Sequence, residues 1–202
     1  MQTAVRAVIF DLGGVLIDWN PDRILAGLYA DPELRTTIKR EVFQHGDWYE
    51  LDKGTLAEDE AVRRFSRRTG RPVADMEALL QTAVESLEPI PESWVLVREL
   101  TAQAIPLYCL SNMLERSFLY LQRYNFWRHF EGVVISARIK LAKPERAIFD
   151  HLINTYNLEP AASVFVDDHL PNVEGARQAG LQGILFTGVD DCRSELRRLM
   201  GT

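Results

Sequence analysis

Short apolar runs alternate with amphipathic stretches along much of this chain of 202 residues. The runs are rich in β-branched or aromatic residues and are too short for helices. Continuous apolar runs of this kind are typical of strands that are buried on both faces. We therefore predict five buried strands, at residues 4–10, 105–110, 132–135, 163–166 and 183–186.

Stretches with helical periodicity follow these runs, and two of them begin at a proline, which suits the first turn of a helix. The predicted helices cover residues 91–103, 114–124, 144–156, 172–179 and 191–200. Regular alternation of strands and helices predicts a parallel sheet with helices on both faces. The expected fold class is α/β, with a three-layer, Rossmann-like core.

The interval from residue 21 to residue 88 breaks this rhythm, because it has helical periodicity and many charges but no convincing strand. Its predicted helices are at residues 22–29, 32–43, 57–70 and 73–87. We interpret residues 18–88 as an inserted helical cap domain, and residues 1–17 and 89–202 as the core. An insertion after the first strand lies over the carboxyl ends of the strands, where open α/β sheets bind ligands.

Composition and charge narrow the class of protein. With 47% hydrophobic and 26% charged residues, the chain is typical of a soluble globular protein. Its net charge of −6 repels nucleic acid and anionic membranes, so we expect neither as a partner. Two cysteines are too few for a disulfide framework, and the first apolar stretch, interrupted by Arg6, suits neither a signal peptide nor a membrane span. The expected location is cytoplasmic.

Candidate chemistry begins where the first strand ends. Asp11 places a carboxylate at that end, and Gly13 and Gly14 permit a tight turn close to a ligand. Asp11 is therefore a candidate nucleophile, although an isolated aspartate after a strand is more often a turn cap.

Three later segments carry polar groups to the same predicted edge. Ser111 and Asn112 end the second run, Lys143 precedes a helix, and Asp167 and Asp168 end the fourth run. Each has a structural alternative, as a helix cap or a solvated charge. Adjacent carboxylates on a buried strand repel each other without a cation, and hard oxygen ligands suit Mg²⁺ completed by a substrate phosphate. Together these segments predict a site for an anionic substrate.

The segments FDLGGVLID, LSN, KP and FVDD, followed by LPNVEGARQAG, resemble the haloacid dehalogenase-like hydrolase superfamily in this order. The resemblance covers nearly the entire chain, including the helical insertion. In detail, the chain is similar to the branch that contains sugar-1-phosphate phosphatases and the amino-terminal phosphatase domain of soluble epoxide hydrolase.

The resemblance implies a Mg²⁺-dependent phosphatase that acts on a small phosphorylated metabolite. Asp11 would be the nucleophile that accepts the phosphoryl group, Ser111 and Asn112 would bind that group, and Lys143 would offset its charge. A covalent aspartyl-phosphate splits the hydrolysis into two easier steps. The implied substrate is a sugar phosphate or another small phosphomonoester. We expect a monomer or a small homo-oligomer.

The same resemblance implies the metal site. Asp11, Asp168 and the carbonyl of Gly13 would hold Mg²⁺. Asp167 would orient a metal-bound water or the lysine, and Asn172 would tether the loop that carries the metal ligand.

Gly13 departs from the family pattern, because most phosphatases of the superfamily have a second aspartate there that acts as general acid and base. A general acid and base usually raises the reaction rate by about 10²–10⁴-fold, and in this chain that contribution must come from another group. Candidates are Asp18, His45 and Asp47, or a substrate whose leaving group needs little protonation, such as an acyl phosphate or anomeric sugar phosphate.

The missing acid also keeps two rivals open. Haloacid dehalogenases use the same nucleophile without metal and likewise lack the second aspartate, but they do not need the pair Asp167 and Asp168. A catalytically inactive member that only binds a phosphometabolite or a protein partner has little need of the three costly charges Asp11, Lys143 and Asp168. We therefore favour the phosphatase.

Aromatic residues in the insertion are candidates for substrate specificity. Phe43, Trp48 and Tyr49 flank Gly46. Such residues usually pack the core of their own domain, but we predict that Trp48 and His45 face the substrate.

Overall fold

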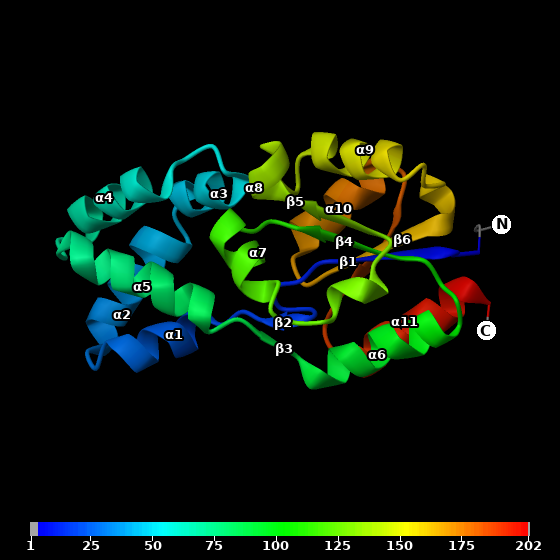
Figure 1. Ribbon diagram of the computed structural model, residues 1–202, viewed down its shortest axis with the longest axis horizontal. Coiled ribbons are helices and arrows are strands. Elements are labelled where there is room, and N and C mark those ends of the chain that lie inside the picture. Colours follow the sequence, from blue (N-terminus) through cyan, green and yellow to red (C-terminus); the bar gives the residue numbers. More distant parts are fainter. Residues whose placement is uncertain (1–3, 202) are drawn as a thin grey trace.

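The computed structural model describes residues 4–201, and Figure 1 shows a sheet with helices above and below it. The five strands run parallel in the order β5-β4-β1-β6-β7. They are β1 (Ala7–Phe10), β4 (Leu107–Ser111), β5 (Gly132–Ile135), β6 (Ser163–Asp167) and β7 (Gln182–Leu185). All five predicted strands are confirmed, with ends that shift by a few residues.

Alternate residues of the strands face opposite layers of the core. Val8 and Phe10 belong to the hydrophobic cluster beneath one face, whereas Ala7 and Ile9 belong to the cluster beneath the other. Helices α6 (Pro91–Ala102) and α11 (Val189–Met200) cover the first face, with α9 (Arg146–Thr155) and α10 (Leu170–Gln178) on the second. The three-layer α/β core is thereby confirmed.

Residues 21–85 form a helical lobe with a hydrophobic cluster to which Leu114 of the core also contributes. Its helices are α1 (Pro21–Leu28), α2 (Pro32–Ile38), α3 (Gly46–Lys53), α4 (Glu58–Thr69) and α5 (Val73–Glu85), and a π-helix at Lys39–Phe43 continues α2. The sequence did not predict α3, because Leu51 is its only fully buried apolar residue and the periodicity is correspondingly weak.

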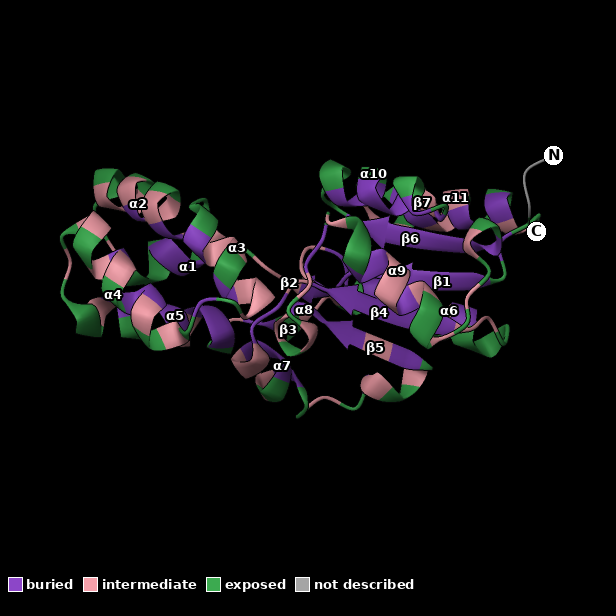
Figure 2. Ribbon diagram, turned by 90° about the horizontal axis from the view of Figure 1, so that it is seen from above, coloured by how far each residue is buried: buried purple, intermediate pink, exposed green. Residues whose placement is uncertain are grey.

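The chain enters and leaves the helical lobe through a two-stranded antiparallel pair, β2 (Ile17–Asp18) and β3 (Glu88–Pro89). The expected domain boundaries, after residues 17 and 88, fall within this pair. Of the expected core, residues 1–3 and 202 lie outside the described part. In Figure 2 the strand arrows point toward the helical lobe, so the carboxyl ends of the strands lie at the junction between the two parts.

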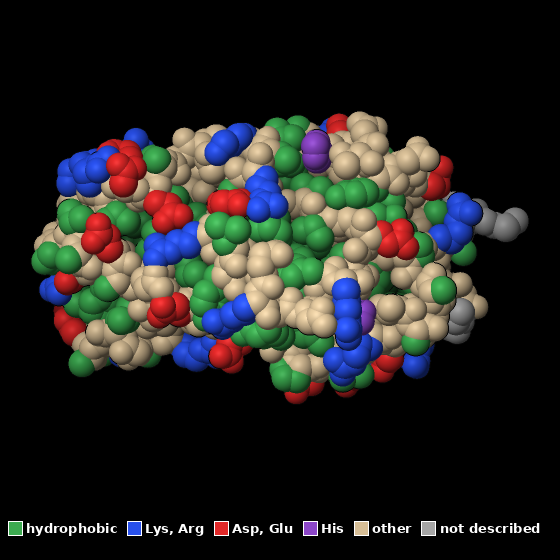
Figure 3. All heavy atoms as spheres, viewed as in Figure 1, with side chains coloured by type: hydrophobic (Ala, Val, Ile, Leu, Met, Phe, Trp, Pro, Cys, Tyr) green, Lys and Arg blue, Asp and Glu red, His purple; other side chains and the backbone are tan. Residues whose placement is uncertain are grey.

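Charged side chains of both signs are interspersed on the face shown in Figure 3. The arginines of α4 are largely paired with acidic residues, among them Arg63 with Asp59 at 2.9 Å. In the stretch from residue 4 to residue 201, no helix combines the length and apolar character that crossing a bilayer would require.

Candidate active site

Polar residues end three adjacent strands of the sheet. Asp11 follows β1, Ser111 ends β4 and Asp167 ends β6, and β1 lies between the other two strands. Parallel strands bring their carboxyl ends to one edge, so these residues meet there. A cavity of about 270 Å³ lies at this edge. It is lined by Asp11, Gly13, Ile17, Trp19, Trp48, Asp52, Leu87, Ser111, Asn112, Met113, Leu114, Ser117, Asp168 and His169.

Lys143 is the buried cation of the site, with 1% of its surface exposed. Its Nζ lies 2.8 Å from Asp11 Oδ1 and 2.7 Å from Asp167 Oδ2. Burial opposes the charged form of Lys143, but the two carboxylates raise its pKa above the ordinary value. Burial raises the pKa of Asp11, and the charge of Lys143 acts against this shift. The lysine therefore neutralises the predicted nucleophile.

Asp167 is completely buried and fully hydrogen-bonded. Besides Lys143, it accepts hydrogen bonds of 3.1 Å at each oxygen from Asn172 Nδ2, and one of 2.8 Å from the backbone N–H of His169. Asn172, in the first turn of α10, thus fixes the end of β6 directly. This arrangement fixes the backbone immediately before Asp168.

The donor set fits a small divalent cation. One carboxylate oxygen from each of Asp11, Asp167 and Asp168 lies within 4.8 Å of the others. Gly14 has a φ of +73°, and a Cβ there would lie 2.2 Å from Asp168 Oδ2, so the glycine leaves room for that carboxylate. Gly13 also lines the cavity. Clustered hard oxygen atoms are the ligands that Mg²⁺ prefers.

Ser111 and Asn112 both line the cavity, but the side chain of Asn112 is engaged elsewhere. Its Nδ2 donates to the carbonyl of Lys143 and its Oδ1 accepts from the backbone N–H of Lys143, both at 2.8 Å. Its side-chain amide therefore holds the segment of Lys143, and the expected contact between Asn112 and the phosphoryl group stays a prediction. Ser111 has no such partner among the described hydrogen bonds.

Three residues considered as acids or substrate contacts are not among those that line the cavity. His45 caps α3, its Nδ1 accepting from the backbone N–H of Asp47 at 3.1 Å. Asp47 itself pairs with Arg64 at 3.1 Å, and Asp18 pairs with Arg23 on α1. Their positions are explained by helix capping and by ion pairs with arginines of the helical lobe.

Trp48 lines the cavity and stacks on Trp19 with ring centroids 5.6 Å apart. Trp19 and Asp52 are lining residues that sequence reasoning missed. Trp19 could have been predicted as a cavity residue, because it follows directly on the point where the chain passes from the core to the helical lobe. No comparable signal marked Asp52, because its orientation depends on where α3 begins.

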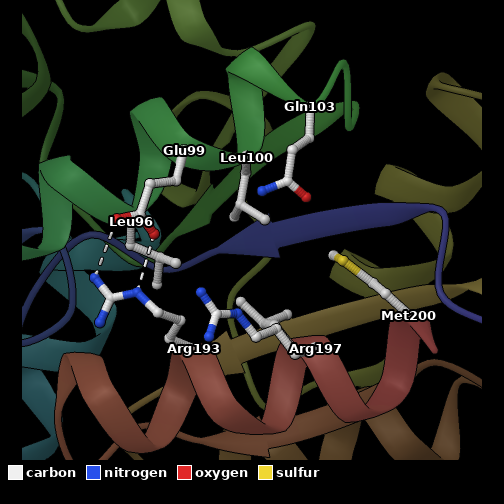
Figure 4. A pocket seen from close by; sticks show the side chains of 8 residues that line it. Leu96, Glu99, Leu100, Gln103, Arg193, Arg197 and Met200 are labelled. Atoms are coloured by element: carbon white, nitrogen blue, oxygen red, sulfur yellow. Dashed lines mark hydrogen bonds and ion pairs between the residues drawn. The ribbon is translucent and has the colours of Figure 1, made fainter. Parts of the chain in front are cut away.

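A second hollow, of about 210 Å³, lies between α6 and α11 (Figure 4). Arg193 Nε lies 2.9 Å from Glu99 Oε2 across it, and Leu96, Leu100 and Met200 contribute apolar wall. It contains none of the predicted site residues.

The α/β fold, with carboxylates and a buried lysine at the carboxyl edge of its sheet, is typical of a class of hydrolases. The family of haloacid dehalogenase-like hydrolases matches residues 5–180, so the chain belongs to that family. It is similar to the sesquiterpene phosphatase astK of Aspergillus oryzae, with 30% identity over all of both chains. It is also similar to the D-ribitol-5-phosphate phosphatase of Bacteroides thetaiotaomicron, with 22% identity over 98% of this chain and all of that protein.

Among solved structures, the chain resembles a haloacid dehalogenase family enzyme from Bacteroides thetaiotaomicron, a variant in complex with magnesium and inorganic phosphate. The TM-score is 0.70 at 19% identity, over 89% of this chain and 93% of that chain. This likeness supports the fold.

Proposed function

We propose that this chain is a Mg²⁺-dependent phosphatase that hydrolyses a small phosphomonoester through an aspartyl-phosphate on Asp11. The observation that carries the proposal is the convergence of three carboxylates and one buried lysine at a single strand edge. An edge with this charge pattern suits a bound cation together with an anionic substrate. Phosphatase-named relatives over the full length add support.

In the proposed reaction, a carboxylate oxygen of Asp11 attacks phosphorus in line with the ester oxygen, and the P–O bond to the leaving group breaks. Lys143 acts against the burial that raises the pKa of Asp11 and offsets negative charge near the phosphoryl group, and Ser111 donates a hydrogen bond to one of its oxygens. Bound Mg²⁺, held by Asp11 and Asp168 with the Gly13 carbonyl, would supply further charge neutralisation. Water then cleaves the aspartyl-phosphate and releases inorganic phosphate.

The walls of the cavity favour a substrate with an apolar leaving group. Its apolar lining residues are Ile17, Trp19, Trp48, Leu87, Met113 and Leu114. Such a wall offers burial to a hydrocarbon chain but few hydrogen bonds to a sugar. The similarity to a sesquiterpene phosphatase points the same way. In this proposal the helical lobe is the cap that excludes water from the reacting group.

A substrate panel tests the proposal. Phosphate release is measured with farnesyl phosphate, glucose 1-phosphate and ribitol 5-phosphate, each with Mg²⁺ and with a chelator. We expect Mg²⁺-dependent release, with the highest kcat/KM for the prenyl ester. Release that is indifferent to chelation would contradict the metal dependence, and a preference for the sugar esters would contradict the substrate class.

The two rival functions predict different results in the same panel. Halide release from 2-haloacids that survives chelation would identify a dehalogenase. The cluster formed by Asp167 and Asp168 with Asp11 argues against it, because a metal-independent reaction has no use for three neighbouring carboxylates. Binding of phosphate esters without turnover would identify an inactive member.

A further inference from the structure

Hydrolysis of an alkyl phosphate needs a proton donor, because an alkoxide is a poor leaving group. The glycine at position 13 supplies no carboxyl, and Asp18, His45 and Asp47 are held outside the cavity. We propose that Asp52, on α3 of the helical lobe, is the general acid and base of the reaction. This inference rests on the proposed phosphatase function.

The ionisable side chains that line the cavity are few. Within residues 4–201 they are Asp11, Asp52, Asp168 and His169. Asp11 is the nucleophile, and Asp168 belongs to the carboxylate cluster. His169 is exposed and is adjacent to that cluster in the chain, on the side of the core. Asp52 alone enters from the helical lobe, which is the side on which the leaving group must lie.

Contacts with the core fix the segment that carries Asp52. Its backbone carbonyl accepts a hydrogen bond from the buried hydroxyl of Ser136, and that hydroxyl also accepts from the backbone N–H of Met113 at 2.8 Å. Ser136 begins α8 (Ser136–Ile139), directly after β5. Asp52 is therefore tied to the same sheet edge as the nucleophile, through one intervening side chain.

Neighbours of Asp52 in α3 make the attachment stronger. Tyr49 and Lys53 both contact Glu145, at 2.8 and 2.5 Å, only two residues after Lys143. The carbonyl of Gly54 accepts a hydrogen bond from Lys140, and a Cβ at this glycine would lie 2.6 Å from the carbonyl of Ala137. This end of α3 forms a fixed wall of the cavity, as accurate proton transfer requires.

The surroundings of Asp52 also favour the protonated form needed at neutral pH. Burial raises its pKa to about 8; hydrogen bonding from Trp48 opposes the rise, the charge of Asp11 adds to it, and Leu114 and Lys143 oppose it. Asp168 and His169 are the other ionisable groups at this cavity. A carboxyl that keeps its proton near neutral pH suits a general acid.

The proposed proton path balances over one turnover. As Asp11 attacks phosphorus and the ester bond breaks, the leaving oxygen takes the proton of Asp52 and departs as an alcohol. The Asp52 carboxylate then takes a proton from water as the water oxygen attacks phosphorus. The bond between phosphorus and Asp11 breaks, and both aspartates return to their starting forms.

The test compares Asp52→Asn with Glu50→Gln, which changes an exposed acid on the same helix outside the cavity. With an alkyl phosphate, we expect kcat to fall about 10²–10⁴-fold in Asp52→Asn and to stay at the wild-type level in Glu50→Gln. With p-nitrophenyl phosphate, whose leaving group needs no proton, we expect a nitrophenol burst stoichiometric with enzyme, followed by slow turnover. Asp52→Glu should restore part of the alkyl phosphatase activity.

Absence of a nitrophenol burst in Asp52→Asn, or unchanged turnover of both esters, would overturn the role of Asp52 while leaving the phosphatase function intact. Thermal unfolding of each variant shows whether a loss of activity comes from misfolding. If Asp52→Asn is misfolded, the same comparison of the two esters is made with Asp52→Glu. Absence of Mg²⁺-dependent turnover in the wild-type enzyme would instead overturn the proposed function.

Discussion

Replacement of the buried Lys143 by methionine tests the electrostatic core of the site. Methionine keeps the length and apolar stem of the side chain but removes the charge that lies 2.8 Å from Asp11 and 2.7 Å from Asp167. At an effective dielectric constant of 20, each contact is worth about 6 kcal/mol before desolvation. Because burying the ammonium and two carboxylates offsets most of this, we expect a net loss of about 3–5 kcal/mol at pH 8.

The loss should depend on pH. Burial already raises the pKa of Asp11 above its unfolded value, and removal of the lysine raises it further. A raised carboxyl pKa contributes stability below the unfolded pKa, and this contribution is lost as pH rises through the folded pKa. The Lys143→Met protein should therefore recover part of its stability at pH 5, where Asp11 is protonated.

Urea denaturation followed by tryptophan fluorescence, with a chelator present, measures this loss. Arg198→Ala is the control, since Arg198 pairs with Glu195 on the exposed face of α11 and its loss should cost less than about 1 kcal/mol. A cost below 1 kcal/mol for Lys143→Met at pH 8, or an equal cost at pH 5 and pH 8, would refute the reasoning.

Two further predictions concern the metal site and the cavity wall. Gly14→Ala should raise the Mg²⁺ concentration for half-maximal activity more than tenfold, because the new Cβ would lie 2.2 Å from Asp168 Oδ2. Gly70→Ala is the control, because Gly70 has a φ of +67° and an added Cβ there would meet no atom within 4 Å. This variant should introduce only backbone strain and leave that Mg²⁺ concentration unchanged. Trp48→Ala should raise KM for a prenyl phosphate at least tenfold but alter KM for glucose 1-phosphate less than threefold; equal increases would show that the ring does not bind the apolar group.

The sequence predicts the core well because its strands are short, apolar and buried on both faces. In parallel sheets, whatever follows such strands meets at one edge, which is why Asp11, Ser111 and Asp167 could be grouped without coordinates. The burial of the Lys143 side chain between two carboxylates could not be predicted in this way, because the position of Lys143 depends on the long connection after β5.

The contribution of the helical lobe was harder to predict, and α3 shows why. Asp47 and Asp52 are five residues apart, so they project from different sides of the helix. Asp47 faces Arg64 and Arg68, and Asp52 faces the cavity. Unless the first residue of α3 and its contacts with the core are known, the sequence does not show which of these two aspartates faces the cavity.

The covalent step itself is the most direct test of the account. Rapid quenching with a ³²P-labelled phosphomonoester and Mg²⁺, followed by tryptic digestion, should place label on the peptide of residues 7–23, which contains Asp11. The label should be lost on treatment with hydroxylamine, as an acyl phosphate is, and should be absent in Asp11→Asn and in the presence of a chelator. Continued phosphate release by Asp11→Asn, or label on a different peptide, would contradict the central claim.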